Sequence, residues 1–576
     1  MPLFFWPFIL IFWTSGTGAQ CPRTTKAPCH CSATRDGQSA EITCDNARSL
    51  HDALVSIGDI QNLRIRTLVL QNTPIRELPD FAFQGYNINR LVLNNNNLLQ
   101  IRDRAFDGVL QDNLMELDLK NNQLGQIPAQ GTLANLKRLK MLILAKNRIA
   151  QLPKRPFEQY ASKNHLTKID LSGNQLSRIG QDVFQDLTNL EEISLEANRL
   201  EVLPVPLFFD LRLLKNLNLG LNRLSNVPIR SLDFQNLESL SLEFNNLTYL
   251  PAECFRSVPK LNYLSLTGNR FQMWDPDMFR YIGNLRILGM GDTSITRIPQ
   301  NAFQNIRNII RLEMSESAVA AIDQGAFQQI ANVETIVMNK NRLKKINVTT
   351  FQLLHKLESL DLSGNLMTEI EDRSFSNLPS LKHLDVSTND LQLLHPSTFA
   401  NTFSDNGKNR VLYSCENPWI CDIRLSWFRQ WLRQNPDIVI DKPPGCMALC
   451  KYPSELINWP LRSEDPISLT TEKLPPFTLP TLNEAEVPNT LAWIILAIIL
   501  AILLFAILLL AIVRYFMSQK RKREKDEEAR MVSVANSMRQ SSATSTGSNS
   551  YPGATASIVD LNLPPATSLY DKDVYI

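Results

Sequence analysis

Cysteine is the residue type in this sequence with the clearest potential chemistry. The chain has nine cysteines, and eight of them form two quartets far apart in the sequence: Cys21, Cys29, Cys31 and Cys44, then Cys415, Cys421, Cys446 and Cys450. Such quartets form disulfides in an oxidising compartment or hold zinc in a reducing one. The ninth, Cys254, stands alone and is either a buried free thiol or one half of an intermolecular disulfide.

Residues that could carry catalysis do not come together in any recognised pattern. The sequence contains no H-E-x-x-H, P-loop, G-x-S-x-G or dinucleotide-binding fingerprint, and its six histidines are not grouped at metal-ligand spacing. The formal net charge is +2, which indicates no general attraction to nucleic acid. We therefore predict a protein that is not an enzyme and has no cofactor, no metal and no nucleic-acid partner.

The part of the sequence that separates the two cysteine quartets is a repeat. Six polar residues follow one another at steps of 24 residues, and a series of phenylalanines from Phe279 to Phe399 runs beside them at the same step. Each polar residue is the ninth of a block such as 357–367, in the order L-x-x-L-x-L-x-x-N-x-L that is the leucine-rich repeat signature. Leu360 and Leu362 predict a strand with both leucines inward, and Asn365 predicts a corner where its amide satisfies buried backbone groups.

The predicted fold is an α/β-type leucine-rich repeat solenoid, a horseshoe with a parallel sheet on its concave wall. Three corners carry a hydroxyl in place of the amide, which predicts the same contact in a slightly weaker form. We count about 14 repeats over residues 63–403, with corners at Thr73, Asn96, Asn122, Asn147, Asn174, Asn198, Asn222, Asn245, Asn269, Thr293, Ser317, Asn341, Asn365 and Asn389.

A cysteine-rich cap is expected at each end, because an open solenoid end would expose its leucines to water. Residues 20–62, with the spacing C-x7-C-x-C-x12-C, resemble the N-terminal flanking module of extracellular leucine-rich repeat proteins. The resemblance implies the pairs Cys21–Cys31 and Cys29–Cys44, whereas spacing alone leaves three connectivities open. A zinc site is the alternative interpretation of this quartet.

Residues 404–460 resemble the C-terminal flanking module of the same family. Trp419, Trp427 and Trp431 supply the apolar area that would close the last turn. The sequence departs from the family pattern at Ile423, where a second cysteine of a Cys-Asp-Cys group is usual. Cys415 is the candidate replacement, and the bridges of this quartet stay open.

The segments outside the caps predict a membrane protein. Residues 1–19 predict a cleaved signal peptide, since an apolar run too short to span a bilayer precedes small residues. Residues 461–490 form a Pro- and Thr-rich stalk, 491–513 an uncharged span of 23 residues, and 514–576 a tail that begins with a basic cluster. Positive residues stay cytoplasmic, so we expect a single-pass type I plasma-membrane protein with an extracellular N-terminus.

Three groups of residues are candidate sites. Apolar and acidic residues on the concave face of neighbouring turns, Leu221, Glu243, Phe244 and Tyr263, are candidates for ligand binding, although Leu221 and Phe244 lie close to corners, where local packing is the alternative. The sequons at Asn246 and Asn347 predict glycosylation. The C-terminal residues, Val574, Tyr575 and Ile576, fit the groove of a PDZ scaffold.

The order of cap, repeats, cap, stalk, span and short tail resembles single-pass leucine-rich repeat receptors and adhesion proteins of animals, including tartan- and capricious-like and neuronal leucine-rich repeat proteins. The resemblance implies binding to an extracellular or cell-surface protein ligand during development or morphogenesis, with cytoplasmic scaffolds recruited by the tail. A membrane-tethered organiser of extracellular matrix is the alternative from another class. An innate immune receptor that uses a co-receptor is less favoured, because the tail is too short for a signalling domain.

Overall fold

The computed structural model describes residues 21–35, 37–60, 63–128, 130–403 and 410–464. The predicted signal peptide, membrane span and PDZ-type C-terminus lie outside these residues. Among the residues that the structure does describe, no helix is both long and apolar enough to cross a membrane.

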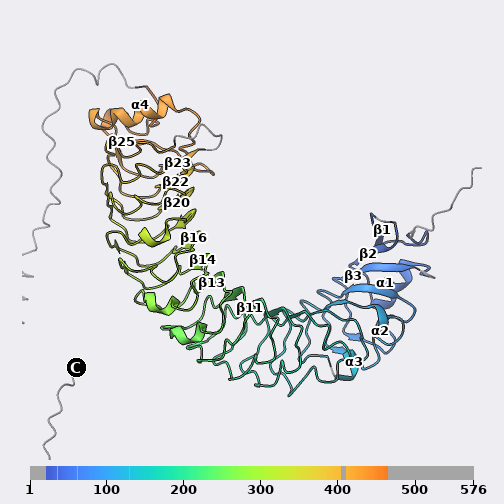
Figure 1. The fold of residues 1–576 in the computed structure, drawn as a ribbon. Helices are drawn as coiled ribbons and strands as arrows, with labels where there is room; N and C mark the ends of the chain where they lie inside the picture. Colours follow the sequence, from blue (N-terminus) through green and yellow to red (C-terminus); the bar gives the residue numbers. More distant parts are fainter. Residues whose placement is uncertain (1–20, 36, 61–62, 129, 404–409, 465–576) are drawn as a thin grey trace, which may run out of the picture. The chain divides into compact units, whose positions relative to one another are not determined.

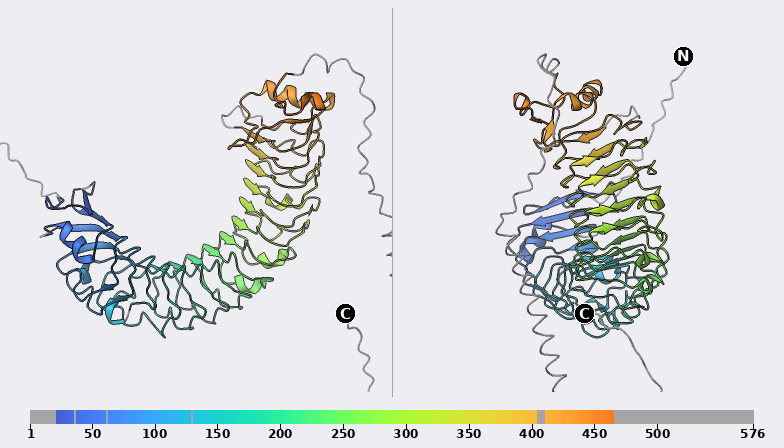
Figure 2. Two further views of the ribbon diagram at one scale, coloured as in Figure 1. Left: turned by 180° about the vertical axis from the view of Figure 1, so that it is seen from behind. Right: turned by 90° about the vertical axis from the view of Figure 1, so that its left-hand side faces the viewer.

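The described chain is a curved solenoid whose strands lie along its inner wall (Figures 1 and 2). One sheet of 17 strands forms this wall within the described residues. Fifteen of them pair in parallel, each with the strand of the next turn: β3 (Arg64–Gln71), β5 (Asn87–Val92), β7 (Glu116–Asp118), β8 (Met141–Ile143), β9 (Lys168–Asp170), β10 (Glu192–Ser194), β11 (Asn216–Asn218), β12 (Ser239–Ser241), β13 (Tyr263–Ser265), β14 (Ile287–Gly289), β16 (Arg311–Glu313), β18 (Thr335–Val337), β20 (Ser359–Asp361), β22 (His383–Asp385) and β23 (Val411–Tyr413).

The central residue of each strand points into the core. Leu360, for example, is in register with Ile336 and Leu384, and all three are fully buried. Away from the main sheet, three short parallel pairs join neighbouring turns: β4 (Glu77–Leu78) with β6 (Gln100–Ile101), β15 (Arg297–Ile298) with β17 (Ala321–Ile322), and β19 (Lys345–Ile346) with β21 (Glu369–Ile370). Short helices also lie between strands of the main sheet: α2 (Leu110–Asn113), α3 (Gln130–Ala134), η1 (Ala252–Phe255), η2 (Pro276–Phe279) and η3 (Gln328–Ile330).

The corner residues bond adjacent turns together, as their residue type predicted. The amide of Asn365 donates to Met338 O at 3.0 Å and to Leu362 O at 2.9 Å, and its Oδ1 accepts from Leu343 N at 3.1 Å. At a hydroxyl corner the equivalent bond is longer, because Ser317 Oγ lies 3.4 Å from the carbonyl it reaches in the preceding turn. The predicted role of the corner, and its weakening where a hydroxyl replaces the amide, are confirmed.

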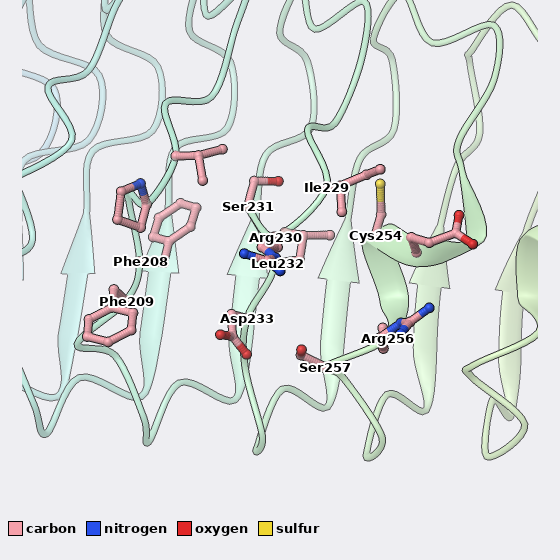
Figure 3. A pocket seen from close by; sticks show the side chains of 13 residues that line it. Phe208, Phe209, Ile229, Arg230, Ser231, Leu232, Asp233, Cys254, Arg256 and Ser257 are labelled. Carbon is pink, nitrogen blue, oxygen red and sulfur yellow. The ribbon is translucent and has the colours of Figure 1, made fainter.

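The phenylalanine series forms a ladder of buried rings inside the solenoid. Ring centroids of Phe303, Phe327 and Phe351 lie 5.6 and 5.7 Å apart, and the series continues to Phe399. Its last member stacks on Trp431 at 5.5 Å, so the ladder runs into the C-terminal cap. In an earlier turn Ser231 stands nine residues before Leu240, where the neighbouring turns have Phe208 and Phe255, and it lines the pocket of Figure 3.

The N-terminal cap extends the sheet by two strands. β2 (Ala40–Asp45) pairs in parallel with β3, and β1 (Cys29–Ala33) pairs antiparallel with β2. α1 (Leu50–Ile57) begins at Ser49, whose side chain accepts from Asp52 N at 3.1 Å. Cys21 is bonded to Cys31 and Cys29 to Cys44, the pairing that the family resemblance implied.

The stack contains one turn more than the fourteen we counted. β23 lies in the residues assigned to the C-terminal cap, and Asn417 makes the corner bonds of a fifteenth turn, donating to Val386 O at 2.9 Å. The pattern hides this turn because Ser414 stands where the third leucine of the block is expected. The indole of Trp419, which is fully buried, covers that position and donates to Ser414 O at 2.8 Å.

The C-terminal cap closes the last turn with aromatic side chains from α4 (Ser426–Gln434) and the segments around it. Trp427 donates to Leu394 O at 3.0 Å, while Phe428 and Trp431 pack on Phe399. Disulfides join Cys415 to Cys446 and Cys421 to Cys450, which answers the question that the spacing left open. The remaining elements of the cap are β24 (Trp419–Ile420), β25 (Cys450–Tyr452), η4 (Ile423–Leu425) and η5 (Ser454–Leu456).

Candidate functional site

On the concave wall, equivalent residues of successive strands lie side by side and form rows. The residues on either side of the buried central leucine point out of the wall, as expected for strand alternation. In-register pairing from β11 to β14 therefore places Asn216, Ser239, Tyr263 and Ile287 in one row. We did not single out Ile287 from the sequence, although it stands 24 residues after Tyr263 and could have been found by that step.

Many of the charges on this wall are neutralised by a neighbouring turn. Arg90 lies 3.2 Å from Glu116, and Lys168 lies 2.6 Å from Glu192. Opposite charges on adjacent strands attract one another directly, which leaves less net charge for a ligand. These residues are consequently weak candidates for recognising a charged partner.

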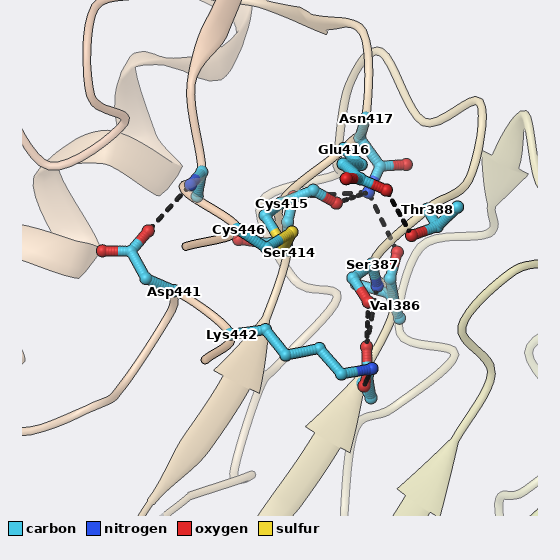
Figure 4. The surroundings of a disulfide bond; sticks show 12 residues. Val386, Ser387, Thr388, Ser414, Cys415, Glu416, Asn417, Asp441, Lys442 and Cys446 are labelled. Atoms are coloured by element: carbon cyan, nitrogen blue, oxygen red, sulfur yellow. Dashed lines mark hydrogen bonds and ion pairs between the residues drawn. A yellow bond between two sulfur atoms is a disulfide. The ribbon is translucent and has the colours of Figure 1, made fainter. Parts of the chain in front are cut away.

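The C-terminal cap also reaches onto the wall. Lys442 extends from the cap and its Nζ lies 2.6 Å from the Asp385 carboxylate, which is almost completely buried (Figure 4). Burial acts to lower the pKa of the Lys442 ammonium, but the hydrogen bond to Asp385 and its charge outweigh that effect and raise the pKa. His383, on the same strand as Asp385, packs edge-on against Tyr413 with centroids 5.4 Å apart. This end of the wall is therefore fixed by the cap.

Several carboxylates on the wall form no ion pair within the described part of the chain, and Glu196 and Glu243 are two of them that lie in nearby turns. Glu196 accepts from Asn218 Nδ2 at 3.0 Å, and Glu243 accepts from Ser265 Oγ at 3.1 Å. Gly220 lies in the turn between them, and a Cβ there would be 3.0 Å from the Glu243 side chain. The absence of a side chain at Gly220 leaves the two carboxylates open to a ligand.

Tyr263 lies beside Glu243. Its ring is half-buried, and the pKa of its hydroxyl is raised above the ordinary value by burial first and by the charge of Glu243 second. A carboxylate next to an aromatic face is a combination that suits a guanidinium or ammonium group.

Leu221 and Phe244 occupy equivalent positions at the rim, immediately before two corner asparagines. Both have left-handed backbones, with φ of 54° and 49°, and both remain exposed, at 45% and 44%. Asparagine and glycine adopt this conformation most readily, so large apolar residues here are unusual. The Phe244 ring also covers Gly268 of the next turn, where a Cβ would lie only 2.3 Å from the ring.

The structure thus places the four candidates in one region over β11–β13. Glu243 and Tyr263 lie on the wall, and Leu221 and Phe244 on its rim, joined through backbone bonds such as Leu221 N to Glu243 O at 2.8 Å. Of the two sequon residues, Asn347 is exposed and Asn246 is half-buried beside a corner. Glycosylation of either residue stays a prediction.

Comparison with known proteins agrees with the repeat architecture. The family model described as Leucine rich repeat matches residues 164–224, 235–294, 283–343 and 331–391, and a BspA type Leucine rich repeat region model matches residues 60–164. No curated protein sequence matches the chain.

Solved structures share the fold at low sequence identity. A leucine-rich repeat protein of Leptospira interrogans is 23% identical with a TM-score of 0.56, covering 67% of this chain and 92% of that one. A chain of the glycosylated Toll–Spatzle complex of Drosophila is 20% identical with a TM-score of 0.50, covering 75% of this chain and 72% of that one. Since the family models together match more than half of the 576 residues, this chain belongs to the leucine-rich repeat proteins.

Proposed function

We propose that this protein is a cell-surface receptor or adhesion molecule that binds a protein ligand on its concave wall, at the region over β11–β14. The observation that carries the proposal is the Glu243 carboxylate, which forms no ion pair in the described residues and stands beside Tyr263, while Glu196, also without an ion pair there, lies two turns before it. The fold of the Toll–Spatzle complex, in which Toll is bound to Spatzle, supports a protein as the ligand.

The chemistry of this region favours a ligand with an arginine or lysine side chain. A guanidinium would pair with Glu243 while stacking on the ring of Tyr263, and Glu196 would add a second charge nearby. Leu221 and Phe244 would cover the apolar stem of that side chain from the rim. Charged contacts surrounded by apolar groups are the usual composition of an interface hot spot.

A binding screen with matched variants tests this proposal. The ectodomain fused to Fc is screened against secreted and cell-surface proteins, and each hit is measured again with Glu243→Lys and Tyr263→Ala. Each change should weaken binding by about 30-fold or more, as for a hot-spot loss of about 2 kcal/mol. Glu116→Lys is the matched control, because Glu116 lies on the same wall but is already paired with Arg90. Hits that respond equally to Glu243→Lys and Glu116→Lys would place the site elsewhere.

We further propose that the chain is anchored as a type I plasma-membrane protein, with residues 514–576 in the cytoplasm. Both caps contain disulfides, which persist in oxidising compartments and therefore support an extracellular location for the solenoid. Surface biotinylation of intact cells should label residues 21–464 and not the tail. Deletion of 516–576 distinguishes a receptor from a tethered matrix organiser, since only the organiser would keep full function without its tail.

The C-terminal residues, Val574, Tyr575 and Ile576, are proposed to dock in a PDZ groove. A C-terminal peptide of this sequence should bind PDZ domains. Amidation of its carboxylate or addition of one glycine should abolish that binding, because the groove holds a free terminal carboxylate.

A further inference from the structure

A row of exposed arginines follows the corner residues along one edge of the solenoid. In four of the six turns whose corners run from Asn147 to Asn269, the residue directly after the corner is an exposed arginine. No turn from residue 97 to residue 342 has an acidic residue at this position, whose occupants are Asn97, Gln123, Arg148, Gln175, Arg199, Arg223, Asn246, Arg270, Ser294, Ala318 and Arg342. We call the four side chains Arg148, Arg199, Arg223 and Arg270 the arginine row.

Backbone hydrogen bonds hold the arginine row in register. Arg223 N donates to Leu200 O at 2.8 Å, which places Arg223 one turn beyond Arg199, and equivalent bonds hold Arg148, Arg199 and Arg270. Turns joined in this way lie about 4.8 Å apart, so the row spans about 24 Å from Arg148 to Arg270. Each arginine therefore begins about 5 or about 10 Å from the next one, on a backbone that fixes the spacing.

The charges of the arginine row are not neutralised by neighbouring side chains. None of the four guanidinium groups forms an ion pair with any residue that the structure describes, in contrast to the pairs on the concave wall. The positions one before and three after each corner flank the row, and over the same six turns they contribute one cation, Lys146, and one acid, Glu201. The wall carboxylates Glu196 and Glu243 stand two positions before their corners and accept hydrogen bonds from the wall itself. This edge is therefore a positive strip on a chain whose formal net charge is only +2.

The geometry of the strip suits a linear polyanion. A guanidinium group pairs through two donors with an anion that offers several oxygens, as sulfate and phosphate do. A small anion would meet one or two of these arginines, whereas a polymer with an anionic group on each unit meets the whole row. The row itself contains no aromatic side chain on which nucleic-acid bases could stack. The disulfides in both caps favour an oxidising, extracellular compartment, where sulfated polysaccharides are the abundant linear polyanions.

We propose that the arginine row binds a sulfated glycosaminoglycan. The polysaccharide lies along the edge of the solenoid, from turn to turn, and its sulfate groups meet Arg148, Arg199, Arg223 and Arg270 in succession. Gln175, which stands in the same row, supplies an amide between the first two arginines. The row lies beside the rim of the concave wall, but this binding does not depend on the protein ligand proposed there.

The predicted glycosylation site at Asn246 stands within the row, between Arg223 and Arg270. A glycan on Asn246 would cover this part of the edge. The binding experiment is therefore made on the Asn246→Gln background, in which no glycan can stand there.

The test measures binding of a heparin dodecasaccharide to the full-length chain in phosphatidylcholine nanodiscs, at about 0.15 M salt. The variant Arg199→Gln/Arg223→Gln should weaken binding by at least about tenfold. Glutamine already occupies the equivalent position at Gln123 and Gln175, so this variant should fold and keep its melting temperature. The slope of log affinity against log salt should also fall by about 1–2, because two ionic contacts are lost.

The matched control is Arg286→Gln/Arg307→Gln, which removes the same charge from two exposed arginines that precede strands β14 and β16. This control should change heparin binding by less than about twofold. Both variants keep the basic cluster of the tail, so the difference between them reports on the arginine row alone. Tyr263→Ala on the concave wall should bind heparin like the background, which separates this proposal from the proposed function.

Desulfated heparin should bind at least about tenfold more weakly than heparin, because the arginines pair with sulfate groups. The proposal is overturned if the test variant and its control lose affinity equally, or if desulfated heparin binds as well as heparin. It is also overturned if a single-stranded RNA of the same charge binds the row more tightly than heparin does, since a nucleic acid would then be the occupant.

Discussion

Replacing Asn365 by alanine should locally loosen the solenoid by an amount that the corner geometry predicts. The side chain donates to Met338 O and Leu362 O and accepts from Leu343 N, at 2.9–3.1 Å, and it is buried. Alanine leaves Leu343 N without a partner in a place that water does not reach, whereas Met338 O and Leu362 O each keep the amide of another corner, Asn341 at 3.0 Å and Asn389 at 3.1 Å. One unpaired group costs about 1–3 kcal/mol and the two lost bonds cost somewhat less each, so the expected loss is about 2–4 kcal/mol.

The loss should remain near residue 365, because each turn of a solenoid contacts mainly its two neighbours. Hydrogen exchange of the full-length chain, followed by mass spectrometry, measures this directly. Peptides covering residues 338–367 should exchange at least about 30-fold faster, since 1.4 kcal/mol corresponds to a factor of ten. Peptides around Leu117, many turns away, should exchange at the wild-type rate.

The reverse substitution is the control for this reasoning. Ser317 Oγ reaches the preceding turn only at 3.4 Å, so Ser317→Asn should restore the shorter bonds seen at the asparagine corners. Exchange around residues 290–319 should slow by about three- to tenfold, which corresponds to about 1 kcal/mol for a hydrogen bond. The reasoning is refuted if Asn365→Ala changes exchange by less than threefold, or if Ser317→Asn accelerates it.

Three further predictions follow from single positions. The Cys254 thiol is buried, and burial is the first cause that raises its pKa to about 11. At pH 8 the thiol should therefore resist thiol reagents in the native protein and react stoichiometrically in denaturant. A disulfide-linked dimer on a non-reducing gel would contradict this. Gly268 has a φ of 70°, and Gly268→Ala places a Cβ 2.3 Å from the ring of Phe244, so this change should lower the stability of the folded protein by about 1–2 kcal/mol. The control Gly125→Ala, with open space around its Cβ, should have little effect on the melting temperature. A hydrogen bond from Arg410 is the first cause that holds the pKa of Asp437 below its ordinary value, so this carboxylate stabilises the C-terminal cap above about pH 4, and the contribution is lost as the pH falls through the lower folded-state pKa. Wild type should therefore lose its stability advantage over Asp437→Asn across that interval, and an unchanged difference between the two would contradict this.

The sequence predicted the fold because its signal is local and repeated. A corner asparagine, an inward leucine pair and a ring at a fixed step each have one physical role, and the same role recurs in turn after turn. The fifteenth turn was not predicted because Ser414 replaces a leucine, and the compensating bulk comes from Trp419, five residues later. A sequence pattern that tests each position separately cannot detect that the side-chain volume missing at one position is supplied by another.

The candidate site was predicted less completely, for two physical reasons. Strand alternation placed Glu243 and Tyr263 on the concave wall, but it could not show which acidic residues lack a cation. The pairing of Glu116 with Arg90 depends on strand register and side-chain conformation together. The left-handed backbone at Leu221 is a further feature that the prediction lacked. The sequence does indicate it, because the residue before a corner is frequently asparagine or glycine, which adopt this conformation readily.

The pocket at Ser231 shows why a short turn can leave a cavity in this fold. In a globular core, neighbouring side chains move only partly into the place of a missing ring. Here Phe234, three residues later, packs on Phe208 with centroids 5.4 Å apart and fills part of the space. The turns on either side cannot close the remainder, because β11, β12 and β13 are held in register and fix their separation.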